Sequence, residues 1–328
     1  MNHKMHILVL GSTGFLGGHI ARAGFDKGWH IRGLRRDPGA SGNLPDIPIE
    51  WVEGNLMNPA SLLSAMQGVD LIFHAAGYYP KSKDKLGLKA HLTLAEEEIR
   101  NVLEAARRAG VKRMVYTSSL STIGLPPSEE TRLADERDFY RPGFLPRNPY
   151  YEVKIAMERA VLERVSNDFE PVIVNPTVVL GPGDIHRSST RFIRYIIQKK
   201  VPVFLPVTVN IIDVRDMAAA QIMAAEKGRP GERYILGGHN LALVDALTQV
   251  ARIAGVQPPR MKIPLGVVDR LVKIGDRIPW LRISSHVKAI HTWQGYNTSK
   301  AEQELGLSPR PVAETFRDTI AWLKVEGN

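Results

Sequence analysis

Near its N-terminus the chain reads HILVLGSTGFLG, from His6 to Gly17. An apolar run of strand length leads directly into a glycine-rich turn, and a helical pattern begins at Phe15. Glycines at positions 11, 14 and 17 let the backbone turn tightly and approach a ligand closely. The free amide groups of a helix N-terminus at such a turn favour a pyrophosphate. The stretch therefore predicts the start of a dinucleotide-binding fold, and the alternative is a plain strand–helix turn.

The alternation of strands and helices continues along the chain. Strands are predicted at 6–10, 30–34, 49–53, 71–74, 113–117, 171–174 and 234–237, and helices at 15–27, 61–66, 94–109, 148–165 and 214–226. This order predicts an α/β fold with a doubly wound parallel sheet of the Rossmann type. The remaining segments indicate a smaller, mostly helical C-terminal lobe. Two long turn-rich stretches, 125–149 and 181–189, are expected to carry substrate contacts.

The same pattern suggests how the chain divides into domains. We expect a nucleotide-binding domain at 1–175, completed by a returning segment at about 212–237. The substrate-binding lobe is then built from residues 176–211 and 238–328.

Composition excludes several classes of protein. The 328 residues include no cysteine, so a disulfide framework, a thiolate metal site and a cysteine nucleophile are excluded. No metal site is expected, a cytoplasmic location is favoured, and no apolar run is long enough for a membrane span. The net charge of +9 favours polyanionic ligands. The basic residues are nevertheless scattered, without the stripe or motif of a nucleic-acid-binding protein.

The predicted second strand runs into Arg35, Arg36 and Asp37. At this place NAD-binding enzymes usually have an acidic side chain for the ribose 2′-hydroxyl. Guanidinium groups instead pair with the 2′-phosphate of NADP, which would repel a carboxylate. Arg35 and Arg36 therefore favour NADP(H), and NAD(H) stays open because Asp37 could turn toward a ribose.

A pair of chemically suited side chains lies on the helix predicted at 148–165. Tyr150 and Lys154 are four residues apart and share one face of that helix, a spacing that Tyr151 does not fit. A phenol ionises at about pH 10, and a neighbouring ammonium group stabilises the phenolate and lowers its pKa. Hydroxyl groups at Ser118, Ser119 and Ser121 follow the strand 113–117, at the edge where open α/β sheets place ligands. These residues predict a site for proton transfer.

The spacing Gly-x-x-Gly-x-x-Gly at 11–17 resembles the extended short-chain dehydrogenase/reductase family. Further landmarks of that family follow in order: HAAG at 74–77, YTSS at 116–119, YxxxK at 150–154, NP at 175–176, GPGD at 181–184 and a closing segment at 296–306. The resemblance covers essentially the whole chain.

The resemblance implies a catalytic triad of Ser119, Tyr150 and Lys154. Ser119 would orient the reacting carbonyl, Tyr150 would transfer the proton, and Lys154 would tune this tyrosine and bind the nicotinamide ribose. Besides Arg35, Arg36, Tyr150 and Lys154, the implied cofactor-binding residues are Gly11, Thr13, Gly14, Phe15, Leu16, Gly17, Asn55, Leu56, Ala75, Ala76, Gly77, Thr117, Pro176 and Val178. His74 is expected to be structural. Two positions depart from the family pattern. Asn55 stands where the family usually has an aspartate, and Leu94, Ala95 and Glu96 stand where it usually has an asparagine near the start of the helix predicted at 94–109.

The resemblance leaves the reaction open. The segment 172–184 is similar to dihydroflavonol- and cinnamoyl-type reductases and to hopanoid-associated epimerase-like proteins. Val209 stands where sugar-nucleotide epimerases commonly have an arginine for the pyrophosphate, and together with the NADP-type arginines this favours reduction of a ketone to a secondary alcohol. The alternatives are a nucleoside-diphosphate-sugar epimerase or dehydratase that uses Arg191, Arg194 or Arg215, and a non-catalytic NADP-sensing regulator.

A bulky apolar small molecule is the expected substrate, because apolar and aromatic residues occur in the expected pocket loops. These are Tyr78, Tyr79, Phe139, Tyr140, Phe144, Phe204 and Leu205. Whether the protein is a homodimer stays open.

Overall fold

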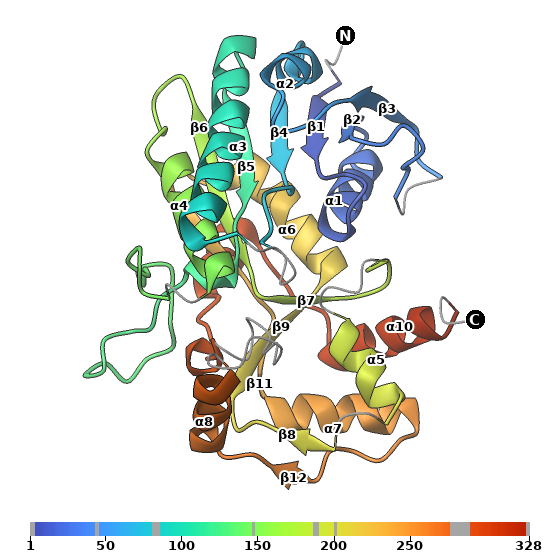
Figure 1. Ribbon diagram of the computed structural model, residues 1–328. Helices are drawn as coiled ribbons and strands as arrows, with labels where there is room; N and C mark the ends of the chain where they lie inside the picture. The colour runs from blue at the N-terminus through green and yellow to red at the C-terminus, as the bar shows by residue number, and fades with distance from the viewer. Residues whose placement is uncertain are drawn as a thin grey trace.

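The computed structural model describes residues 4–42, 46–80, 86–145, 148–185, 190–199, 202–275 and 289–325. Residues 146–147 and 186–189, which belong to the two predicted turn-rich stretches, lie outside the described residues. The described chain forms a large part around one sheet and a smaller part beneath its strand ends (Figure 1).

A seven-stranded parallel sheet forms the centre of the larger part. Its strands follow the order β10-β6-β5-β4-β1-β2-β3. They are β1 (His6–Leu10), β2 (His30–Arg35), β3 (Ile49–Glu53), β4 (Leu71–His74), β5 (Arg113–Thr117), β6 (Glu170–Pro176) and β10 (Arg233–Leu236). The strand order reverses between β1 and β4, and open α/β sheets bind their ligands at such a reversal. The predicted Rossmann-type sheet is confirmed.

Helices cover both faces of this sheet (Figure 1). One face carries α1 (Phe15–Asp26) and α6 (Val214–Lys227), and the other carries α2 (Pro59–Met66), α3 (Leu88–Ala109) and α4 (Pro149–Leu162). Since side chains alternate along a strand, β1 supplies both cores. Ile7 and Val9 pack on the side of α1 and α6, and Leu8 and Leu10 pack on the side of α2 and α3.

The smaller part contains the C-terminal helices together with short strands. Its helices are α5 (Arg191–Ile197), α7 (Leu243–Ala254), α8 (Leu265–Gly275) and α10 (Val312–Val325). A three-stranded sheet contains β7 (Val178–Leu180), β9 (Thr208–Asp213) and β11 (His239–Ala242), and a two-stranded sheet pairs β8 (Val203–Phe204) with β12 (Met261–Lys262). The helical lobe is confirmed. Four of its five strands were not predicted because runs of two to four residues give no period to detect, and β9, with six residues, is buried along nearly its whole length and shows no alternation of buried and exposed positions.

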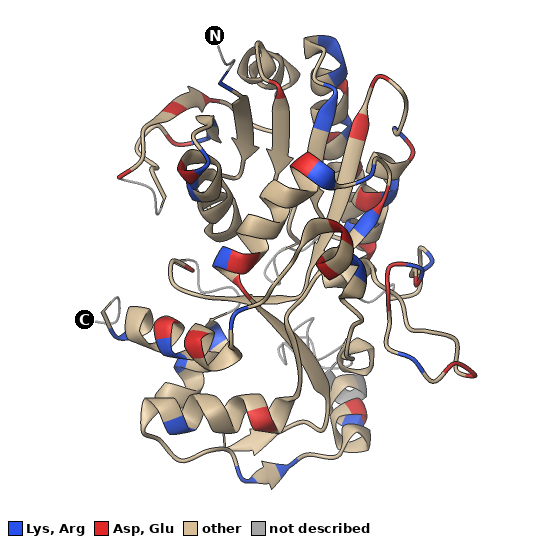
Figure 2. Cartoon of the chain, turned by 180° about the vertical axis from the view of Figure 1, so that it is seen from behind, with Lys and Arg blue, Asp and Glu red and all other residues tan. Residues whose placement is uncertain are grey.

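The helix α3 is longer than predicted. It begins at Leu88 rather than at residue 94, because Gly87 in an extended conformation precedes it as N-cap. Polar residues in its first two turns hide the apolar period that marks the rest of the helix. Over the described ranges, no helix has both the length and the apolar character needed to cross a bilayer. Basic and acidic residues are interspersed over both parts of the molecule (Figure 2).

Candidate active site

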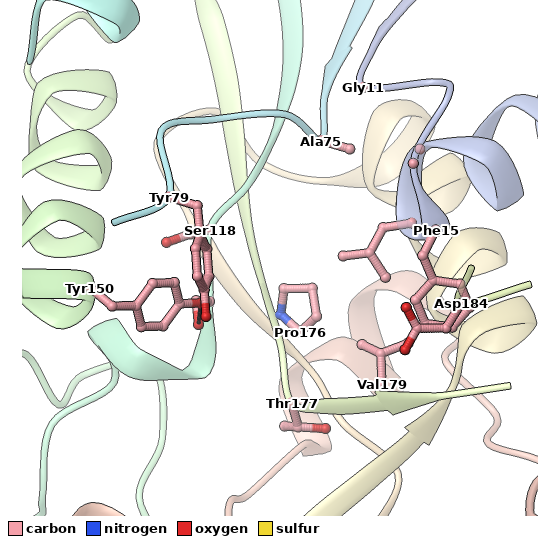
Figure 3. Close-up of a pocket in the computed structure, with 14 residues that line it drawn as sticks. Gly11, Phe15, Ala75, Tyr79, Ser118, Tyr150, Pro176, Thr177, Val179 and Asp184 are labelled. Carbon is pink, nitrogen blue, oxygen red and sulfur yellow. Dashed lines mark hydrogen bonds between the residues drawn. The ribbon is translucent and has the colours of Figure 1, made fainter. Parts of the chain in front are cut away.

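The strand ends of the large sheet open into a cavity of about 430 Å³ (Figure 3). Residues that follow β1, β4, β5 and β6 meet residues of β7 and α4 there. The lining consists of Gly11, Gly14, Phe15, Leu16, Gly17, Ala75, Tyr79, Ser118, Ser119, Tyr150, Pro176, Thr177, Val179 and Asp184. The cavity lies at the reversal of strand order, where the fold places a ligand.

The glycine turn between β1 and α1 forms one wall of the cavity. Gly11 has a φ of 93°, and its carbonyl accepts a hydrogen bond of 2.9 Å from the amide of Gly14. A Cβ at Gly17 would stand 2.2 Å from the Gly11 carbonyl oxygen, so a side chain there would collide with the turn. No side chain caps the N-terminus of α1. This cradle fits the pyrophosphate of a dinucleotide, because it offers backbone amides and no side chain that would fill the space.

The structure brings many, but not all, of the predicted cofactor-binding side chains to this cavity. Thr117 donates a hydrogen bond of 3.0 Å to Gln221 of α6 and does not line it. Val179 lines the cavity in place of Val178, because neighbouring strand residues face opposite sides. Leu56 packs in the core beside α2 and α3.

Asn55 helps to form the turn before α2. The side-chain oxygen of Asn55 accepts a hydrogen bond of 3.0 Å from the backbone amide of Met57. The backbone amide of Asn55 donates a hydrogen bond of 3.1 Å to the Ser61 hydroxyl. The predicted contact with adenine would therefore have to come from the carboxamide nitrogen. Thr13 packs at the outer side of the turn, where a Cβ at Gly42 would stand 2.6 Å from its carbonyl oxygen.

The two arginines predicted to bind a 2′-phosphate lie at the end of β2. The guanidinium of Arg35 packs over the ring of Trp51 at 5.3 Å, and Arg36 is exposed. A Cβ at Gly33 would stand 2.7 Å from the Ser12 hydroxyl, so this end of β2 lies against the glycine turn. The arginines therefore stand on the side of the turn where the adenosine half of a dinucleotide fits.

Tyr150 and Ser119 meet at the opposite end of the cavity. The Tyr150 hydroxyl donates a hydrogen bond of 3.1 Å to the Ser119 Oγ, which also accepts the amide of Ser121 over 3.1 Å. Lys154 follows one turn later on α4 and is buried. Tyr151 points into the core instead and shares a hydrogen bond of 2.9 Å with Thr292. The geometry separates the two tyrosines in the way that the four-residue spacing predicts.

Burial shapes the acid–base properties of this pair. It raises the pKa of Tyr150 to about 12, against the opposing effect of the Ser119 hydrogen bond. Burial also lowers the pKa of Lys154, and the carboxylates of Glu98 and Glu158 oppose that shift. A positive charge beside a phenol favours the phenolate, and the four-residue spacing on α4 predicts this role for Lys154 toward Tyr150.

Behind the site, Arg233 and Glu158 form a buried ion pair. The Arg233 Nε lies 2.9 Å from Glu158, and both side chains are under 5% exposed. Glu158 also accepts hydrogen bonds of 2.7 Å from Thr122 and from Asn175. The guanidinium of Arg233 in turn donates to backbone carbonyls at Thr122, 136 and 138. The pair thus joins α4 and the Ser119 turn to the stretch after residue 125.

His74 has a structural place, as predicted. It is fully buried, with its ring 5.4 Å from that of Tyr116 in an edge-on arrangement. Burial lowers its pKa to about 3, and Lys154 adds to the shift. The histidine is therefore neutral near pH 7 and contributes no charge to the site.

Most of the aromatic residues expected around a substrate lie elsewhere. Among the seven predicted, Tyr79 lines the cavity, and its ring centroid is 4.9 Å from that of Tyr150. Phe139 packs against Arg233 at 4.0 Å, Tyr140 is buried, and Phe204 belongs to the core of the lobe. The residues next to them in the sequence do not indicate which of these side chains points into the cavity.

The arginines considered for binding a pyrophosphate differ in whether their guanidinium groups are already paired with carboxylates. Val209 is buried in β9, so its position offers no charge. Arg215 is held by Asp213 and Asp318 at 2.8 and 2.7 Å. Arg191, by contrast, is exposed at the start of α5.

Sequence reasoning did not single out several residues of the site. Thr177, Val179 and Asp184 line the cavity, and Asp184 accepts hydrogen bonds of 3.0 Å from the amide and hydroxyl of Thr190. The available signals were the place of Thr177 directly after β6 and of Asp184 in the GPGD segment after β7, because residues after a strand reach the sheet edge. Glu98 gave no such signal, since it stands among three consecutive glutamates of α3.

Comparison with known proteins places the chain among dinucleotide-dependent enzymes. Residues 7–237 match the model of the NAD dependent epimerase/dehydratase family. The chain is 32% identical to a putative dihydroflavonol 4-reductase of Synechocystis sp., over 97% of this chain and 94% of the relative. It is 27% identical to sterol demethylase protein B of Methylococcus capsulatus, over 98% and 99%. A solved nucleoside-diphosphate-sugar epimerase from Pseudomonas aeruginosa superimposes with a TM-score of 0.84 at 25% identity, over 98% of each chain.

Proposed function

Because the chain belongs to the NAD dependent epimerase/dehydratase family, we propose that this NAD(P)-dependent oxidoreductase reduces a ketone of a bulky small molecule to a secondary alcohol. One observation carries the proposal. The Tyr150 hydroxyl lies 3.1 Å from the Ser119 Oγ, with Lys154 one turn away, at the end of a cavity whose other end is the glycine turn.

The residues of the chain divide the work as follows. When bound, NAD(P)H supplies the hydride that the carbonyl carbon accepts. The Ser119 hydroxyl orients the carbonyl oxygen, and Tyr150 donates its phenolic proton to that oxygen as the alcohol forms. Lys154 would stabilise the resulting phenolate and bind the nicotinamide ribose. Gly11, Gly14 and Gly17 would hold the pyrophosphate at the start of α1.

Two features favour net reduction over epimerisation of a nucleoside-diphosphate sugar. Val209 offers no charge, and Arg215 is already paired with two carboxylates. Relatives named dihydroflavonol 4-reductase and cinnamoyl-CoA reductase support the same choice. An epimerase would have to use one of the two other arginines named for this role, the exposed Arg191 or the half-buried Arg194 of α5.

We also propose that the cofactor is NADP(H). Arg35 is held over Trp51 beside the glycine turn, and Arg36 is exposed next to it. Residues 1–175 with 212–237 would hold this cofactor, and residues 176–211 and 238–328 would shape the substrate site.

The test is cofactor balance with a panel of bulky ketones and of UDP-, GDP- and dTDP-sugars. We expect one NADPH to be consumed per alcohol formed. Tyr150→Phe should abolish turnover while it leaves NADPH affinity nearly unchanged, and Tyr151→Phe is the matched control. Interconversion of a nucleotide sugar at constant NADPH would overturn the proposal in favour of the epimerase. A Tyr150→Phe variant with full activity would remove this tyrosine from the reaction.

A further inference from the structure

A buried carboxylate that the proposed reaction has not used lies beside Lys154. Glu98 of α3 is 8% exposed, although its neighbours Glu96 and Glu97 face solvent. Its Oε1 accepts a hydrogen bond of 2.6 Å from the backbone amide of Tyr78. The segment that this bond holds, Ala75–Tyr79, contributes Ala75 and Tyr79 to the wall of the cavity.

Glu98 and Lys154 face the same small space in front of Gly77. A Cβ at Gly77 would stand 3.8 Å from the Glu98 Oε1 and 3.8 Å from the Lys154 Nζ. Gly77 has a φ of 150° and places no side chain of its own in this space, which the Cε of Met157 also approaches, 3.3 Å from the position of the added Cβ.

The remaining charged groups near Lys154 do not replace Glu98. Glu158 lies on the same helix, but it is already paired with Arg233 and accepts two further hydrogen bonds. His74 approaches from β4 and is neutral near pH 7. Arg36, which follows β2, lowers the pKa of Glu98 and is not among the groups that shift the pKa of Lys154.

Three groups oppose the effect of burial on Glu98. Burial raises the pKa of Glu98, and the Tyr78 amide, Lys154 and Arg36 oppose that shift. In the other direction, the Glu98 carboxylate opposes the fall that burial causes in the pKa of Lys154. A negative charge at Glu98 therefore acts on the lysine of the Tyr150–Lys154 pair.

We propose that Glu98 is a positioning residue of the active site, which holds the Ala75–Tyr79 segment against the bound nicotinamide and keeps the Lys154 ammonium in place beside Tyr150. The inference rests on the proposed function of Tyr150 and Lys154. The two tasks depend on different features of the Glu98 side chain. Its length lets the carboxylate bond to the Tyr78 amide and so hold the Ala75–Tyr79 segment, and its negative charge acts on the Lys154 ammonium group.

Two variants separate these tasks. Glu98→Gln keeps an acceptor for the Tyr78 amide and loses the charge. It should bind NADPH within about threefold of the wild type. Without the negative charge of Glu98, the Lys154 ammonium group loses a stabilising neighbour and its pKa falls. The alkaline limb of ketone reduction should therefore move down by about one pH unit. Glu98→Asp keeps the charge and loses the reach. It should leave the alkaline limb in place and weaken NADPH binding about tenfold.

Glu97→Gln is the matched control, because it removes the same charge from the exposed neighbour on α3. NADPH affinity is measured by fluorescence titration without any substrate, so this readout does not depend on turnover. If both Glu98 variants match Glu97→Gln in affinity and in pH profile while Tyr150→Phe is inactive, the inference about Glu98 is wrong and the proposed function stands. An active Tyr150→Phe contradicts the proposed function instead. If Glu98→Gln does not fold, unchanged NADPH affinity of Glu98→Asp overturns the inference by itself.

Discussion

Replacing Gly17 with alanine should damage the cofactor site more than the fold. The new Cβ would stand 2.2 Å from the Gly11 carbonyl oxygen, 2.5 Å from its carbon and 3.0 Å from the Ser12 nitrogen, all of them backbone atoms. To reach an ordinary contact, the turn must retreat by about 1 Å or more. Such overpacking costs about 1–3 kcal/mol of the free energy of unfolding. The displaced turn also loses at least one amide–phosphate hydrogen bond, worth about 1.5–3 kcal/mol, so the Kd for NADPH should rise tenfold or more.

Fluorescence titration with NADPH and urea unfolding measure the two effects. Gly266→Ala in α8 is the control, because nothing lies within 4 Å of its new Cβ. We expect this control to bind NADPH like the wild type. A folded Gly17→Ala protein with a Kd within twofold of the wild type would refute the assignment of the pyrophosphate to this turn.

Three further predictions follow from charged and titratable groups. Arg233→Met leaves the Glu158 carboxylate buried without its partner and should lower the free energy of unfolding in urea by about 3–5 kcal/mol. Arg229→Met, which removes an ion pair at the surface, should have a much smaller effect, and equal losses for the two variants would contradict the role of burial. The pKa of His74 falls from 6.5 in the unfolded chain to about 3 in the folded protein. Below about pH 6.5 the unfolded chain therefore binds a proton at this histidine and the folded protein does not, so the free energy of unfolding decreases as the pH falls. Between pH 7 and pH 5 this loss should be about 2 kcal/mol larger in the wild type than in His74→Gln, and parallel pH curves would show a charged histidine. Arg35→Ala and Arg36→Ala should each weaken NADPH about tenfold more than NADH, and equal losses for the two cofactors would remove the 2′-phosphate argument.

Local signals in the sequence predicted the large sheet and placed Tyr150 and Lys154 on one face of a helix, and the family resemblance singled out Ser119 as the partner of Tyr150. The strands and helices of that part are long enough to show their periods, and a spacing of four residues on a helix fixes the relative direction of Tyr150 and Lys154. The structure turns Val179 rather than Val178 toward the cavity, because a strand of three residues has no register of its own and takes it from the pairing of β7 with β9.

Contacts between distant segments were beyond the sequence. The side chain of Thr117 turns to Gln221, 104 residues away, and the burial of Glu98 depends on the loop after β4. Neither partner can be identified from local pattern, because residue types such as threonine and glutamate are common at exposed positions as well. The charged partners of Arg215 are hidden for the same reason, so only the structure shows that this arginine is occupied.

The order in which the sheet is completed has a consequence for synthesis of the protein. The core on the side of α1 also needs α6, which comes about a hundred residues after β5 in the chain, and β10 then closes the sheet edge beside β6. Until the ribosome has added those residues, α6 does not yet pack over Phe73, Val115 and Val174, which face that side of the incomplete sheet. Apolar strand faces in this condition attract chaperones and other nascent chains. A ribosome stalled before residue 214 should therefore carry a chain that is sensitive to protease and has no compact nucleotide-binding half, whereas one stalled well beyond residue 236 should carry a resistant one.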